Sequence, residues 1–233
     1  MGRANPSDRN MNRSVRSGFC IVYVQQKPEE SHCSCNQRKI FIHGVVMRVM
    51  TETLLTGLAA QVNAQSRVLV LGSMPGVVSL QNAQYYAHPR NRFWPLIATL
   101  CDVDLTCGYA RRLQQLQHAG VGLWDVIGQC RRAGSLDAAI VRGSEVVNPL
   151  PQLLAAYPGI QVIACNGAAA HTAFQRWVQP ALPPLAAALP VLALPSTSPA
   201  NAAWPLPRLL LHWSQLQQWL QPPKPGASQQ PRA

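Results

Sequence analysis

The chain has 233 residues, of which 48% are hydrophobic, and its formal net charge at pH 7 is +11. This length suits one domain with a sizeable core, and the excess of basic residues favours a polyanionic partner such as DNA or RNA. Residues 1–50 carry 8 Lys/Arg against 3 Asp/Glu, and residues 51–233 carry 12 against 6. The positive balance therefore extends beyond the N-terminal segment.

The cysteines and the apolar segments exclude several classes of protein. The seven cysteines are odd in number and lack the spacing of a disulfide scaffold, which favours a reducing cytoplasm. Cys101, Cys107, Cys130 and Cys165 also lack the close clustering of iron–sulfur ligands. Cys33 and Cys35 form a lone CxC beside His32, for which a metal site is the minor alternative. We expect no membrane span, because four prolines interrupt the apolar residues 181–195.

Residues 1–46 are polar and irregular, with 20–24 as their only strand-like run, and they make up most of an N-terminal extension at 1–49. They lack the features of a signal peptide. We interpret them as a disordered basic extension or an incorrectly assigned start, with translation beginning near Met50; a DNA-clamping arm is the alternative. A domain at 50–221 then begins with a predicted capped helix, because Thr51 precedes Leu54, Leu55 and Leu58 at helical spacing. Residues 222–233 are predicted to be a disordered tail.

A buried parallel strand is predicted at residues 68–72, which read VLVLG. In the loop that follows, Pro75 and Gly76 allow sharp turns, and Ser73 and Ser79 supply hydroxyl groups, so the loop can hold a flat or anionic ligand. The polar and aromatic run YYAHPRNRFW follows at 85–94. This is the edge at which open α/β sheets bind their ligands.

Helices and strands alternate along the rest of the chain, which predicts a parallel sheet covered on both faces. Asp125 stands within an apolar strand and needs a partner if it is buried, as an anchor for a loop or as a catalytic group. The loops after the first and last strands should face each other across one cleft. The predicted helices are 93–101, 111–118, 145–157, 168–178 and 206–220, and the further strands are 121–127, 161–165 and 191–194.

Three blocks carry a resemblance to a known family: GSMPG at 72–76, YYAHPRNRFW at 85–94 and STSPAN at 196–201. In this order, with apolar strands before the first and third, they resemble the uracil-DNA glycosylase superfamily, and most closely its hypoxanthine-DNA (deoxyinosine) glycosylase branch. The resemblance covers about residues 67–220. It implies a three-layer α/β/α sandwich with a central four-stranded parallel sheet. It also implies DNA with deaminated bases as the partner, and no cofactor.

The resemblance gives the central catalytic role to Asn91, whose amide is both donor and acceptor and takes up no proton near neutral pH. On the sequence alone, without the resemblance, Asn91 can equally be a loop cap. Tyr86 is expected to stack on a flipped base, or else to pack in the core. The backbone N–H groups around Ser73 and Met74 are expected to stabilise the departing base.

Further side chains are expected around the base and along the DNA strand. Asn166 is a rim residue of the base pocket or simply a helix cap, and Ser196 belongs to the same pocket. The expected strand contacts are Pro75, Gly76, Ser79, Ser198 and Asn201.

Three positions depart from the superfamily pattern. Met74 stands where relatives acting on mismatches carry a water-positioning asparagine. Ser196 replaces the histidine that stabilises a leaving uracil, and Ala200 replaces a leucine that wedges into the base stack. None of the three blocks contains a lysine that could form a Schiff base with the sugar.

These features predict a monofunctional glycosylase that removes hypoxanthine first and uracil second, with a mainly uracil-removing enzyme or a non-catalytic lesion-binding module as alternatives. We expect a cytoplasmic monomer, associated with the nucleoid if the source is bacterial.

Overall fold

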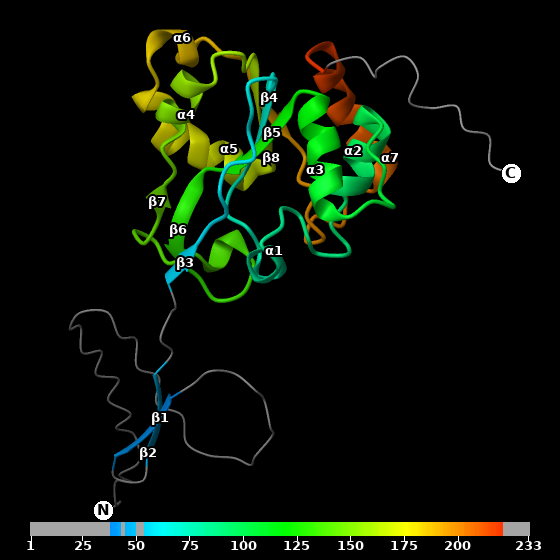
Figure 1. The fold of residues 1–233 in the computed structure, drawn as a ribbon. Helices are drawn as coiled ribbons and strands as arrows, with labels where there is room; N and C mark the ends of the chain where they lie inside the picture. Colours follow the sequence, from blue (N-terminus) through cyan, green and yellow to red (C-terminus); the bar gives the residue numbers. More distant parts are fainter. Residues whose placement is uncertain (1–37, 43–44, 50–53, 221–233) are drawn as a thin grey trace, which may run out of the picture. The chain divides into compact units, whose positions relative to one another are not determined.

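The computed structural model describes residues 38–42, 45–49 and 54–220 (Figure 1). The chain divides into two units, Met1–Glu52 and Thr53–Ala233. In the first unit, β1 (Arg38–Ile42) and β2 (Val45–Val49) pair as an antiparallel hairpin, where no strand was predicted. The run at 20–24, the tail 222–233 and most of the N-terminal segment lie outside the described residues.

The second unit is organised around a four-stranded parallel sheet in the order β5-β4-β8-β9. Every residue of the two strands β4 and β5 is buried, as their unbroken apolar sequences predicted. The predicted four-stranded parallel sheet is therefore confirmed. Its strands are β4 (Val68–Gly72), β5 (Val121–Asp125), β8 (Val162–Asn166) and β9 (Val191–Leu194).

Helices cover both faces of this sheet and complete the predicted three layers. In Figure 1, α2, α3 and α7 lie together on one side, and α4, α5 and α6 lie on the other. The helices are α1 (Val77–Asn82), α2 (Phe93–Cys101), α3 (Tyr109–His118), α4 (Leu150–Ala156), α5 (Ala168–Ala173), α6 (Pro184–Ala187) and α7 (Leu206–Trp213). Single turns at Asp137–Ala139, Gln179–Ala181 and Ser214–Gln218 are 3-10, and Phe174–Val178 is a π-helical turn.

A second, antiparallel sheet in the order β3-β6-β7 corrects the prediction of a helix after Thr51. Its strands are β3 (Leu54–Thr56), β6 (Ile127–Arg131) and β7 (Val146–Val147). Leu55 pairs with Cys130 and packs on the small cluster that contains it. The Gly57 N–H then donates to Gly128 O at 2.7 Å. Pairing with a distant strand thus outweighs local helical spacing.

The same sheet corrects two predicted boundaries. The strand predicted at 121–127 ends at Asp125, because Ile127 already belongs to β6. The helix predicted from 145 begins at Leu150, because Val146 and Val147 pair with β6 and Pro149 precedes the first turn.

The core between the sheet and the α2 and α7 layer fixes the segment before α2. Phe93 and Trp213 are both wholly inaccessible to solvent, and their rings meet edge to face with centroids 6.2 Å apart. Burying each such side chain contributes about 1.5–3 kcal/mol. The loop 85–92 is therefore attached to a firmly packed helix. Within the described residues, no helix is both long and apolar enough to cross a membrane.

Candidate active site

A cavity of about 290 Å³ opens at the carboxyl edge of the parallel sheet. Segments far apart in the sequence form its walls. They include the loops after β4 and β9, which were predicted to face each other across one cleft. The predicted site residues that line it are Asn91, Ser73, Met74, Tyr86, Asn166, Ser196, Pro75, Gly76, Ser79 and Ser198. Asn201 is not among the lining residues.

Asn91 lies directly before α2, and its side chain has the capping role considered for it. Its Oδ1 accepts the Phe93 N–H at 3.0 Å, which caps the helix start, and its own N–H donates to His88 O at 2.8 Å. The cap fixes which end of the amide is the oxygen. In the described part of the chain the amide NH₂ has no hydrogen-bond partner, so it can donate to a molecule in the cavity.

Tyr86 is held as a rigid aromatic wall. Its φ of 56° is left-handed, which costs a residue with a side chain about 1 kcal/mol or more and occurs often at functional sites. Phe93 stacks on one face of the ring, with centroids 3.9 Å apart. The hydroxyl is buried without a hydrogen-bond partner among the described residues, and this burial raises the pKa of Tyr86.

Arg92 clamps the third motif loop to the second. Its guanidinium donates to four backbone carbonyls of that loop, and the Arg92 N–H also donates to Thr197 O at 3.0 Å. The arginine of the HPRN block is thus a structural clamp. The accepting carbonyls are those of Thr197 at 3.5 Å, Trp204 at 2.6 Å, Asn201 at 3.0 Å and Ser198.

The loop that follows β6 forms a wall that sequence reasoning missed. Ser73 Oγ donates to Asp137 Oδ1 at 2.7 Å, and the Val77 N–H donates to Ser135 Oγ at 2.9 Å. The buried guanidinium of Arg132 donates to Pro75 O. Leu136, at the cavity wall, remains 60% exposed. The available signal was the GSLD sequence directly after a strand, with its turn-forming glycine.

The amide of Asn166 is occupied by the third motif loop. Its Oδ1 accepts the Thr197 N–H at 2.9 Å, and its Nδ2 donates to Thr197 Oγ1 at 3.0 Å. Next to it, Gly167 has a φ of +102°, and a Cβ there would lie 2.8 Å from Ser196 Cβ. A glycine is therefore required where the two loops approach.

Ser79 and Asn201 hydrogen-bond to backbone groups of the motif loops. Ser79 is only 6% exposed, and its Oγ accepts the Ala87 N–H at 3.2 Å. The amide of Asn201 donates to Ser196 O at 2.9 Å. Their contacts to a DNA strand stay a prediction.

Asp125 lies at the end of β5, and its side chain lines the cavity. It is 4% exposed, and its Oδ2 has no hydrogen-bond partner among the described residues. Burial raises the pKa of this carboxyl to about 7. The anchoring role considered for Asp125 is carried by its backbone, since its carbonyl accepts from Asn148 Nδ2 at 2.9 Å.

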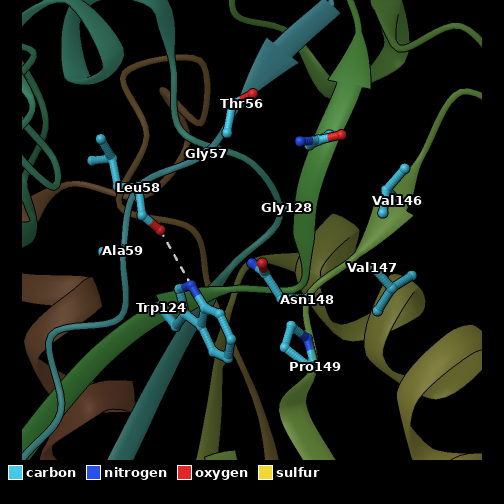
Figure 2. Close-up of a pocket in the computed structure, with 11 residues that line it drawn as sticks. Thr56, Gly57, Leu58, Ala59, Trp124, Gly128, Val146, Val147, Asn148 and Pro149 are labelled. Atoms are coloured by element: carbon cyan, nitrogen blue, oxygen red, sulfur yellow. Dashed lines mark hydrogen bonds between the residues drawn. The ribbon is translucent and has the colours of Figure 1, made fainter.

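A second cavity, of about 360 Å³, lies beside the end of β3 (Figure 2). Figure 2 shows the indole of Trp124 directed to Leu58 O, to which its Nε1 donates at 3.2 Å. Trp124 lines this cavity and its neighbour Asp125 lines the first, as alternation along a strand requires. None of the predicted site residues lines the second cavity.

Comparisons with known proteins agree with this architecture. The family described as the Uracil DNA glycosylase superfamily matches residues 59–220. Proteins named Hypoxanthine DNA glycosylase from Methanosarcina barkeri and Methanosarcina acetivorans are each 35% identical over 112 residues, which cover 48% of this chain and 70% of each relative.

A solved structure shows the same fold. The solution NMR structure of a candidate uracil DNA glycosylase from Methanosarcina acetivorans superimposes with a TM-score of 0.60 at 27% identity. The similarity covers 72% of this chain and 99% of that one. The family match spans well over half of the chain and includes the parallel sheet and all three motif blocks. The chain therefore belongs to the uracil DNA glycosylase superfamily, a family of DNA glycosylases.

Proposed function

We propose that this protein is a monofunctional DNA glycosylase that hydrolyses the N-glycosidic bond of deaminated bases, hypoxanthine first and uracil second, in base-excision repair. The observation that carries the proposal is the single cavity that brings Asn91, Tyr86 and the first motif loop together at the sheet edge. The order of substrates follows the relatives named Hypoxanthine DNA glycosylase.

The cavity suits a base that has left the duplex. Breaking the bond from C1′ to the base gives the sugar oxocarbenium character, and the base departs with the bonding electrons. A flipped base would stack on Tyr86, a contact that contributes about 1–3 kcal/mol. The amide NH₂ of Asn91 and the backbone N–H groups around Ser73 and Met74 would donate to the departing base.

Met74 favours Asn91 as the central residue. Its side chain is 6% exposed and packs with Ile127 and Cys130 in a small apolar cluster. A thioether in this environment cannot orient an attacking water as an amide can. The polar task that the first loop performs in relatives acting on mismatches therefore falls to Asn91.

Leu136 would take the role for which Ala200 is too small. A nucleotide that leaves the stack creates a gap, and proteins that distort DNA fill such gaps with apolar side chains. Leu136 is a large apolar side chain that stays exposed at the cavity wall. We propose that it enters the stack beside the flipped base.

The reaction would stop at an abasic site. A Schiff-base lyase step needs an amine nucleophile. No lysine occurs between residues 54 and 220, the stretch that forms the described part of the second unit. Base release without strand cleavage at the lesion is the expected product pattern.

Base release by the purified full chain tests the proposal. Three matched duplexes, carrying deoxyinosine, deoxyuridine or neither, are incubated with wild type, Asn91→Ala and the control Thr99→Ala, an exposed position on the same helix. We expect hypoxanthine release faster than uracil release, lost in Asn91→Ala and kept in Thr99→Ala. Release of uracil alone would change the substrate assignment. Specific binding of lesion duplexes with no release would instead identify a lesion-binding module.

A further inference from the structure

Two buried polar groups without partners lie together in the active-site cavity. Asp125 Oδ2 and the Tyr86 hydroxyl are both inaccessible, and neither has a hydrogen-bond partner among the described residues. Both residues line the same cavity. Leaving a buried polar group unsatisfied costs about 1–3 kcal/mol. A ligand that enters the cavity can complete their hydrogen bonds.

The strand register places Asp125 beside Gly72, where the first motif loop (GSMPG, 72–76) begins. Asp125 pairs in register with Gly72, the last residue of β4. A Cβ on residue 72 would lie 2.3 Å from Asp125 Oδ1 and 3.8 Å from the Tyr86 hydroxyl. The absence of a side chain at Gly72 thus makes room for the carboxyl group. All three residues line the cavity.

The surroundings of Asp125 favour the neutral form of its carboxyl group. Burial is the main cause that raises the pKa of Asp125 to about 7, and the charge of Asp137 raises it further. The hydroxyl of Tyr85 and the charge of Arg132 act in the opposite direction. Tyr86 faces it as an un-ionised hydroxyl, because burial raises its own pKa. A neutral carboxyl carries an O–H donor that a carboxylate lacks.

Deamination changes one exocyclic group of a base from a hydrogen-bond donor to an acceptor. The O–H of a neutral carboxyl can bond only to the acceptor. Deamination replaces an exocyclic amino group, which donates, by a carbonyl oxygen, which accepts: O6 of hypoxanthine instead of the amine of adenine, and O4 of uracil instead of that of cytosine. The negative charge of the departing base also gathers on its carbonyl oxygen. A buried O–H donor at this oxygen therefore both selects the base and stabilises its departure.

We propose that neutral Asp125 is a further catalytic residue, which donates a hydrogen bond from its buried carboxyl to the exocyclic carbonyl oxygen of the flipped deaminated base. The inference rests on the proposed function and adds the group that distinguishes hypoxanthine from adenine and uracil from cytosine. Burial supports this role over activation of water. The attacked C1′ belongs to the sugar, which stays with the strand, whereas Asp125 is only 4% exposed and would meet a base that has entered the cavity.

The pH dependence of base release distinguishes these roles. Single-turnover release of hypoxanthine is measured from about pH 5.5 to about pH 8.5 for wild type, Asp125→Asn and Asp125→Ala. The wild-type rate should fall as the pH rises through about 7, where the donor is lost. Asp125→Asn keeps an N–H donor and should be active with a flat profile. Asp125→Ala should lose about 10²–10³-fold in rate.

Two results would overturn the assignment while leaving the glycosylase intact. A rate that rises with pH and disappears in Asp125→Asn would identify a general base. Rates and pH profiles unchanged in both variants would reduce Asp125 to a structural residue. Circular dichroism of each variant shows whether it is folded.

A binding measurement tests Asp125 separately from the reaction. Duplexes with 2′-fluoro-deoxyinosine or 2′-fluoro-deoxyadenosine resist hydrolysis, because fluorine disfavours the oxocarbenium-like sugar. Wild type and Asp125→Asn should prefer the inosine duplex, and Asp125→Ala should lose that preference. An equal preference in all three proteins would reject the role of Asp125 even if no base is ever released.

Discussion

At the scale of single residues, the proposed function gives the amide of Asn91 one role in folding and one in the reaction. Its oxygen caps α2 and its NH₂ is available to the cavity. Asn91→Asp should keep the cap, since a carboxylate accepts the same N–H and is favoured at a helix start. It should nevertheless lose most base release, because the donor is gone. Asn91→Ala should lose the donor and also about 0.5–2 kcal/mol of stability.

Urea unfolding and base release, measured on both variants, test this division. Equal stability of the aspartate and alanine variants would contradict the capping role. Full activity of Asn91→Asp would contradict the donor role.

Asp125 should make stability depend on pH in a window set by its pKa. The folded pKa of about 7 lies above the ordinary value of 3.8. Between these values the unfolded chain has released a proton that the folded protein keeps, so the unfolding free energy falls as the pH rises. The full difference corresponds to about 4 kcal/mol.

Urea unfolding of wild type and Asp125→Asn from about pH 4.5 to about pH 7.5 measures this dependence. Wild type should lose stability relative to the variant across that range. A constant difference would mean that Asp125 is already ionised at the acidic end.

At the scale of elements, the clamp from Arg92 should position the whole third motif loop. Arg92→Lys keeps the charge but cannot reach several carbonyls with one planar fork. We expect a loss of about 2–3 kcal/mol in unfolding free energy and slower base release. Arg208→Lys is the control, since Arg208 donates to one carbonyl at 3.4 Å and stacks on Trp204. Similar losses in both variants would contradict a special role for Arg92.

The loop after β6 should matter only when a base must leave a duplex. Leu136→Ala is expected to slow hypoxanthine release from double-stranded DNA and to leave release from single strands unchanged, because a single strand has no paired stack to hold open. Leu185→Ala is the control, since Leu185 is 89% exposed in α6 and outside the cavity. A matching loss on single strands would place Leu136 in the base pocket.

Some elements could be predicted from the sequence because the apolar pattern within the element itself indicates which residues are buried. The helix at 93–101 and the strand at 191–194 have the predicted bounds, since an apolar face or an unbroken apolar run defines each. β3 could not be predicted, because Leu54 and Leu55 obtain partners only from β6, some seventy residues later.

The candidate site also contains residues that could be predicted from the sequence and residues that could not. Asn91 and Tyr86 stand in a recognisable block, and the structure places both at the cavity. The unpartnered Oδ2 of Asp125 and the hydrogen bond from Ser73 to Asp137 depend on which strands lie side by side. Neither has a signature in the linear sequence.

At the scale of the whole molecule, the positive charge should act through exposed arginines on the DNA backbone. Arg90, beside Asn91, is exposed at the cavity edge of the sheet, whereas Arg67 is exposed directly before β4, at the opposite edge. Arg90→Ala should weaken binding to damaged and undamaged duplexes alike. It should also reduce the slope of log K against log salt by about 1.

Fluorescence anisotropy at several salt concentrations, with Arg67→Ala as the control, measures both effects. Equal slopes for the two variants would show that the protein does not contact phosphate at this edge.

The clamp has a consequence for how such an enzyme can diversify. Arg92 grips main-chain oxygens of the third motif loop, and these oxygens are present whatever side chains the loop carries. The position of the loop is therefore separated from its chemistry. Substitutions at Ser196, Ser198 or Ala200 can reshape the cavity wall while the backbone stays in place, so new base preferences can arise in this loop without rebuilding the fold.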